Sequence, residues 1–145
     1  MEKQKGFSLI EVIISIAFIS IVFVGFVMSL GSVGKAVLHS DTRTKARGFV
    51  TSEMENVKSS SYVYAPGNGV ASYTFPSLPA GFQFATLDRN GLQVNGQIYG
   101  IPWDVATNAP YIGSDPIDPG LQKVTIIVTY KNSELVREVS FRANR

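Results

Sequence analysis

Residues 12–34 read VIISIAFISIVFVGFVMSLGSVG, a run of 23 residues without a charged side chain. An α-helix of that length is about 34 Å long, which is enough to cross a hydrocarbon core of about 30 Å. Residues 35–145 differ from this run, because they mix charged, polar and turn-forming residues as water-soluble domains do. The sequence therefore predicts one membrane-spanning segment that carries one small head.

The composition of the 145-residue chain excludes several classes of protein. Because the chain contains no cysteine, it has no disulfide bond, no cysteine-ligated zinc site and no thiol nucleophile. The single histidine, His39, falls in the helical region beside the apolar run, which excludes a Ser-His-Asp triad in the head. The sequence also has no phosphate-binding Gly-x-x-x-x-Gly-Lys loop. We therefore expect no enzyme activity, no catalytic residue, no cofactor and no metal.

The apolar run has two simple interpretations, a cleaved secretory signal and a plain membrane anchor. A secretory signal has an apolar region of about 7–15 residues that ends at a small-residue cleavage site. Here the run is longer and no Ala-x-Ala pattern closes it, which disfavours the secretory signal but leaves the plain anchor open. Lys3 and Lys5 precede the run, and the positive-inside tendency places them in the cytoplasm and the head outside it.

A single carboxylate, Glu11, stands directly before the apolar run. An ionised side chain costs about 3 kcal/mol at the centre of a bilayer and less near its surface, so such a group is normally paired. If the chain were cut after Gly6, the new amino group on Phe7 would bring a positive charge to about one helical turn from Glu11. Between staggered copies of the helix, the same pairing would be an assembly contact.

The segment that surrounds these residues, KGFSLIEV at positions 5–12, resembles the leader junction of type IV prepilins and type II secretion pseudopilins. The resemblance implies that a membrane-embedded prepilin peptidase cuts after Gly6 and N-methylates Phe7, and that Glu11 acts in subunit assembly. It implies a structural filament subunit, whose partners are the peptidase, other pilins or pseudopilins, an inner-membrane assembly platform and its ATPase complex. It also implies a single-pass inner-membrane protein with its head outside the cytoplasm, which later joins a filament at the cell surface.

A helical pattern continues beyond the apolar run. Residues at three- and four-residue spacings form one apolar stripe, namely Ala46, Phe49, Val50, Met54 and Val57. We expect Phe49, Val50, Met54 and Val57 to pack the helix against a sheet. Residues 59–61 and 66–69 are serine-, proline- and glycine-rich and end the pattern, which predicts one helix from about residue 8 to residue 58.

The rest of the chain reads as short strands between turn residues. We expect strands at 70–75, 82–87, 92–99, 122–130 and 135–141, with a turn at 131–133. The expected fold is therefore α+β, a type IV pilin-like helical spine packed against a small antiparallel sheet. The expected organisation is a cytoplasmic leader (1–6), a transmembrane and assembly half of the helix (7–34), an amphipathic half (35–60) and an extracytoplasmic β-rich head (61–145).

The C-terminal part of the chain carries a second, looser resemblance. This part resembles minor pilins of the V type and the I-type minor pseudopilin. The resemblance begins at Trp103, Asp104 and Val105 and continues through a loop and the expected strand pair. This resemblance implies a minor subunit rather than the repeating major one. The machine it serves stays open, because pilus, type II secretion and competence systems share the leader.

Two alternatives concern the head. A pilus-borne binding module for DNA or a surface is motivated by basic residues near the terminal strands, Lys123, Lys131, Arg137, Arg142 and Arg145, which we expect to be exposed. The net charge of +2 and the scatter of basic residues along the chain argue against a dedicated nucleic-acid binder. Calcium binding by Asp104, Asp115 and Asp118 is the other alternative. Aspartate beside proline or glycine is ordinary turn chemistry, and no EF-hand spacing is present.

Overall fold

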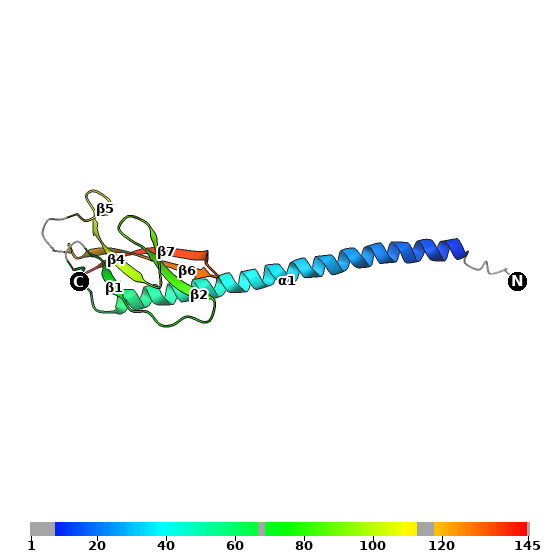
Figure 1. Cartoon of the computed structure of the whole chain (residues 1–145), viewed down its shortest axis with the longest axis horizontal. Coiled ribbons are helices and arrows are strands. Elements are labelled where there is room, and N and C mark those ends of the chain that lie inside the picture. The colour runs from blue at the N-terminus through cyan, green and yellow to red at the C-terminus, as the bar shows by residue number, and fades with distance from the viewer. Residues whose placement is uncertain (1–7, 67–68, 113–117, 145) are drawn as a thin grey trace. The chain divides into compact units, whose positions relative to one another are not determined.

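The computed structural model describes residues 8–66, 69–112 and 118–144. One helix, α1 (Leu9–Ser59), precedes an antiparallel sheet (Figure 1). The strands are β1 (Ala71–Tyr73), β2 (Phe82–Leu87), β3 (Gln93–Asn95), β4 (Ile98–Asp104), β5 (Ala109–Pro110), β6 (Leu121–Tyr130) and β7 (Ser133–Ala143). One long apolar N-terminal helix with an antiparallel curled sheet confirms the expected α+β class and is consistent with the type IV pilin fold.

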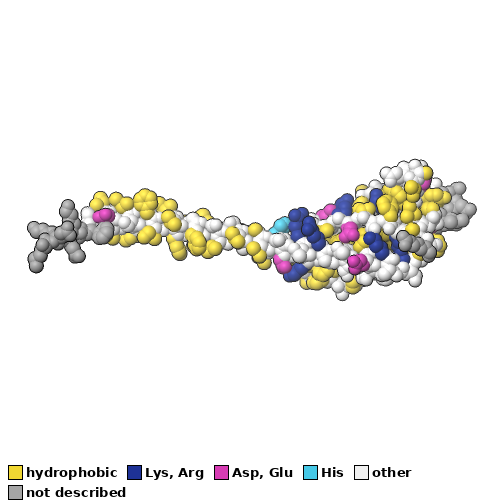
Figure 2. Space-filling model, turned by 180° about the vertical axis from the view of Figure 1, so that it is seen from behind, with side chains coloured by type: hydrophobic (Ala, Val, Ile, Leu, Met, Phe, Trp, Pro, Cys, Tyr) yellow, Lys and Arg dark blue, Asp and Glu magenta, His cyan; other side chains and the backbone are white. Residues whose placement is uncertain are grey.

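The chain forms two compact units, residues 1–41 and 42–145. In the first unit, apolar side chains at successive positions of α1 are exposed, so they cover every side of the helix, and Phe18, for example, is 67% exposed. Figure 2 shows one face of this apolar surface. Ser15 and Ser20 each donate a hydrogen bond to the carbonyl four residues earlier, so their hydroxyl groups are satisfied within the helix. An 18-residue window of α1 has a mean hydropathy of 2.7 and no buried side chain, which by length and composition suits a membrane span.

The sheet of the second unit is organised around β6. One half of β6 pairs with β4 through Val124 and Gly100, and the other half pairs with β2 through Val128 and Phe84. On its other side β6 pairs with β7 along its whole length. The strand order is β1-β4-β6-β2-β3, with β5 added to β4, and all of these pairings are antiparallel.

The core of the second unit lies between the last turns of α1 and one face of the sheet. Its buried side chains include Ala46, Val50, Met54 and Val57 from α1, and Phe84, Ile98, Val124, Ile126 and Val128 from the strands. The residues from β6 are two positions apart, because side chains of a strand alternate between its two faces. Burial of this apolar surface is the main stabilising contribution to the second unit.

The strands differ from the expected ones in the middle of the sheet. The single strand expected at 92–99 is two strands, β3 and β4, because Gly96 turns the chain in a left-handed conformation (φ +68°). β4 then continues through Pro102. Proline is rare inside a central strand, so the sequence did not predict this part of β4. The turn between β6 and β7 was expected. Its central residues, Lys131 and Asn132, both have positive φ, as a two-residue type I′ hairpin requires.

Candidate functional site

The start of α1 positions the only expected assembly residue that the structure describes. Gly6 and Phe7 lie outside the described residues. The carbonyl of Ser8 accepts hydrogen bonds from the backbone N–H groups of Glu11 (3.0 Å) and Val12 (3.3 Å), which begins the helix. Glu11 therefore lies in the first turn of α1, exposed beside the apolar helix surface. A carboxylate is favoured there by the partial positive charge of the helix N-terminus.

The four residues expected to pack the helix lie on the head side of α1. Val50, Met54 and Val57 are buried, at 2% exposure or less, and belong to the core described above. Phe49 is half-buried and packs edge-to-face on Phe82 of β2, with 5.3 Å between ring centroids. All four side chains thus face the sheet.

Asp118 is the centre of a polar network that anchors the segment after α1. Its carboxylate accepts hydrogen bonds from the Tyr62 hydroxyl (2.8 Å), the Ala65 N–H (3.3 Å), the Gly120 N–H (2.9 Å) and the Gln122 amide. Burial strongly raises the pKa of Tyr62, and its hydrogen bond to Asp118 raises it further. No local sequence pattern predicts this network, because its members are up to about sixty positions apart.

The three aspartates considered for calcium do not form a common site in the described chain. The carboxylate of Asp104 accepts hydrogen bonds from the Ala106 N–H and the Thr107 hydroxyl, both at 2.9 Å, and these lower the pKa of Asp104. The oxygens of Asp118 accept the bonds described above, and Asp115 lies outside the described residues. Within residues 8–66, 69–112 and 118–144, no group of three metal-ligating side chains is present.

Arg142 corrects an expectation about the basic residues near the terminal strands. It was expected to be exposed, but it is 6% exposed, and its guanidinium carbon lies 5.6 Å from the ring centroid of Tyr62 and 5.2 Å from that of Tyr73. It also donates hydrogen bonds to the hydroxyl and the carbonyl of Ser60. The expectation was wrong because this end of β7 lies beside the end of α1. There the Ser60 carbonyl and the rings of Tyr62 and Tyr73 stabilise the buried guanidinium.

The other basic residues of that set are engaged in different ways. Arg137 forms a two-point ion pair with Glu134 on β7, with a shortest distance of 2.8 Å. The ammonium group of Lys123 lies 4.2 Å from the ring centroid of Trp103, and Trp103 is half-buried against Phe141. Arg145 lies outside the described residues. The ammonium group of Lys131 lies over the ring of Tyr130, 5.4 Å from its centroid. The described members of the set thus each have a contact within the head.

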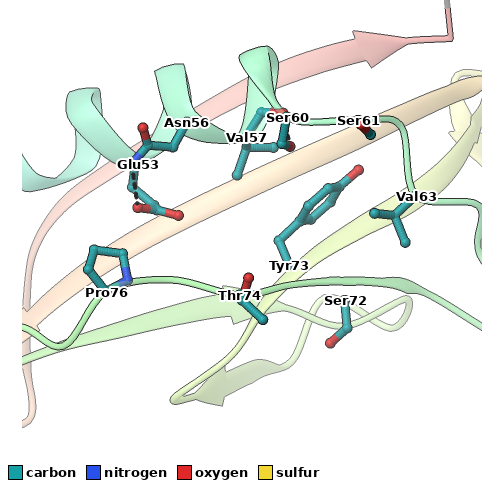
Figure 3. A pocket seen from close by; sticks show the side chains of 10 residues that line it. All are labelled: Glu53, Asn56, Val57, Ser60, Ser61, Val63, Ser72, Tyr73, Thr74 and Pro76. Carbon is teal, nitrogen blue, oxygen red and sulfur yellow. Dashed lines mark hydrogen bonds between the residues drawn. The ribbon is translucent and has the colours of Figure 1, made fainter.

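A cavity of about 560 Å³ lies where the last turns of α1 face β1 and the segment that follows it (Figure 3). It is lined by Glu53, Asn56, Val57, Ser60, Ser61, Val63, Ser72, Tyr73, Thr74 and Pro76. Glu53 is 2% exposed, and its carboxylate accepts one hydrogen bond, from the Asn56 amide at 3.2 Å. Burial raises the pKa of Glu53, and the Asn56 hydrogen bond opposes that change. Glu53 was expected on the polar face of the helix because it is charged, but it lies on the buried face with Val50 and Val57.

The comparisons with known proteins bear on the N-terminal segment. Residues 1–33 match the family described as the prokaryotic N-terminal methylation motif. The chain carries a type IV pilin-like prepilin leader. Such a leader implies processing by a prepilin peptidase and assembly with other pilins, and together with the apolar half of α1 it suggests membrane anchoring. Neither a search of curated proteins nor a search of solved structures found a match.

The match also bears on the expectation that the protein is not an enzyme. The family with this pilin-like leader is structural. The matched residues cover the leader and all but the last residue of the apolar run, and they end before the head begins. The leader thus supports a pilin-like subunit.

Proposed function

We propose that this pilin-like chain is a minor subunit, a minor pilin or pseudopilin, of a type IV pilus or type II secretion-like filament. The observation that carries the proposal is the segment KGFSLIEV at positions 5–12, followed directly by a helix whose apolar side chains are exposed all round. Such a surface is stable only in lipid or against other apolar helices. A filament subunit meets both environments, because it is first embedded in the membrane and then packs among the helices of its neighbours.

Maturation completes the assembly end of α1 in this proposal. Cleavage after Gly6 creates a positively charged amino group on Phe7, and N-methylation keeps that charge while adding apolar surface. The carboxylate of Glu11, exposed in the first turn of α1, is then the counter-charge for the amino group of a neighbouring copy. In apolar surroundings an ion pair is much stronger than in water, so this pair favours one register between the helices.

The remaining parts of the chain have roles that follow from this arrangement. Residues 1–6 are the leader, residues 7–34 span the membrane and later pack in the filament, and residues 35–60 carry the extracytoplasmic head of residues 61–145. The long β6–β7 pair and Trp103 beside it support the minor type, since they underlie the resemblance to V-type minor pilins and the I-type minor pseudopilin.

Intact-mass and N-terminal analysis of the protein from its native membrane tests the proposal. We expect a chain that begins at Phe7 and carries one N-methyl group, and we expect a Gly6→Val variant to keep its leader. A wild-type chain that still begins at Met1, in cells with an active prepilin peptidase, would contradict the proposal and favour the plain anchor.

A further inference from the structure

We infer that the cavity between the end of α1 and β1 binds an alkylammonium group, with the Glu53 carboxylate as its counter-charge. This inference goes beyond the proposed filament role, because it concerns a site in the head that the leader does not involve. The same chemistry is offered by a free alkylamine and by a lysine side chain of a neighbouring subunit. The experiment below distinguishes these two sources.

Glu53 is a buried acid with few polar partners. Among the described residues, its side chain has one polar partner, the Asn56 amide, and no basic side chain within 4 Å. A buried carboxylate is strongly destabilising unless it is paired with a cation or fully hydrogen-bonded. One amide hydrogen bond leaves most of its acceptor capacity unused. A cation in the cavity would supply the missing partner.

The cavity has the size and the mixed polar and apolar lining of a ligand site. Its volume of about 560 Å³ is within the range of about 300–1,000 Å³ that is usual for ligand sites. Figure 3 shows the Glu53 carboxylate and the Thr74 hydroxyl directed into the space between α1 and the segment after β1. Val57 and Tyr73 are buried in its wall, whereas Ser61 and Thr74 are exposed at its rim.

This arrangement matches the parts of an alkylammonium group. An ammonium head needs a carboxylate and additional hydrogen-bond acceptors, and its three donors can bond Glu53 and the hydroxyl groups of the wall. The methylene stem needs apolar contacts, which Val57 and Pro76 provide. A guanidinium is less well suited, since its planar fork favours two free carboxylate oxygens and one oxygen of Glu53 is bonded by Asn56.

The test uses the full chain in detergent micelles, with ¹³C-labelled glutamate and n-butylammonium chloride as the probe near neutral pH. We expect a saturable change in the side-chain carboxyl signal of Glu53, beyond the change that equal sodium chloride produces. Binding should weaken at least about tenfold in Glu53→Gln. Glu55→Gln, which removes an exposed carboxylate from the same helix, should bind as the wild type does.

The possible outcomes separate the inference from a purely structural Glu53. If n-butylammonium has no more effect than sodium chloride, or binds Glu53→Gln equally well, the inference is overturned, and Glu53 is a buried acid without a ligand. Carbodiimide treatment of assembled filaments then identifies the source. A Glu53–lysine cross-link between subunits assigns the site to a neighbouring lysine, whereas probe binding without that cross-link assigns it to a free amine. A failure of leader processing would not alter the n-butylammonium result, because that test uses the full chain in micelles rather than filaments.

Discussion

Gly100 of β4 lies against the side chain of Gln122, whose oxygen fills the space that a Cβ atom at position 100 would take. The same Cβ would stand 2.9 Å from the ring of Tyr73, whose hydroxyl donates a hydrogen bond to that oxygen. Gln122 also donates hydrogen bonds to Asp118 and to the Val63 carbonyl. Because Gly100 has no side chain, Gln122 has room to form its hydrogen bonds with Tyr73, Asp118 and the Val63 carbonyl.

We therefore expect Gly100→Ala to destabilise the head by about 1–3 kcal/mol, the usual cost of overpacking. Denaturant unfolding of the full chain in detergent, followed by tryptophan fluorescence of Trp103, measures the effect. Gly48→Ala is the matched control, because a Cβ at this exposed helix position meets nothing within 4 Å. The control should be neutral or slightly stabilising, since alanine favours helix more than glycine does. Equal stability of Gly100→Ala and wild type would show that Gln122 and Tyr73 can move aside.

The helix–sheet core gives a second prediction. Met54 is 2% exposed between α1 and the strands, and Met54→Ala removes most of that buried side chain. We expect a loss of about 2–5 kcal/mol in the free energy of unfolding, from lost burial and the cavity left behind. Glu55→Ala, at the exposed neighbouring position, should change it by about 0.5 kcal/mol or less. A similar small effect at Met54 would mean that the helix does not depend on this contact.

Glu53 gives a prediction about pH. Because burial raises its pKa above the ordinary 4.5, the folded chain keeps a proton at pH values where the unfolded chain has lost it. The free energy of unfolding should then fall as pH rises from about 4.5 through the folded-state pKa, and level off above it. Glu53→Gln has no proton to lose, so its advantage over wild type should grow across that window. Urea unfolding of both proteins at a series of pH values checks this, and parallel curves would contradict it.

The elements that the sequence predicted well are those specified by local patterns. The bounds of α1 follow from an uncharged run and an apolar stripe, both visible in consecutive residues. The alternation of Val124, Ile126 and Val128 and the turn at Lys131 and Asn132 likewise determine the β6–β7 pair. In these segments the periodicity and the turn chemistry agree with the final structure.

The parts that the sequence did not predict depend on residues that meet only in the folded head. The expected strand ended at residue 99, yet β4 runs on through Pro102 to Asp104, because β6 and β5 both pair with that segment. Arg142 was expected to be exposed, but Ser60 at the end of α1, more than eighty positions earlier in the sequence, lies beside it in the fold. The cavity at Glu53 is lined by residues of α1 and by residues of β1, about twenty positions later. No local sequence pattern predicts that these two elements lie side by side.

The last prediction concerns the assembly role of Glu11, which lies exposed in the first turn of α1. Glu11→Ala removes the expected counter-charge for a neighbour's Phe7 amino group but leaves the leader and the apolar run intact. Insertion and cleavage should therefore continue, while incorporation into filaments should fall at least about tenfold, since an unpaired charge left in apolar surroundings costs about 3–5 kcal/mol. Quantitative immunoblots of sheared filaments and membranes measure both steps. Ser15→Ala, which removes only a hydroxyl bonded to the Glu11 carbonyl, should assemble normally. Normal incorporation of Glu11→Ala would count against the pairing.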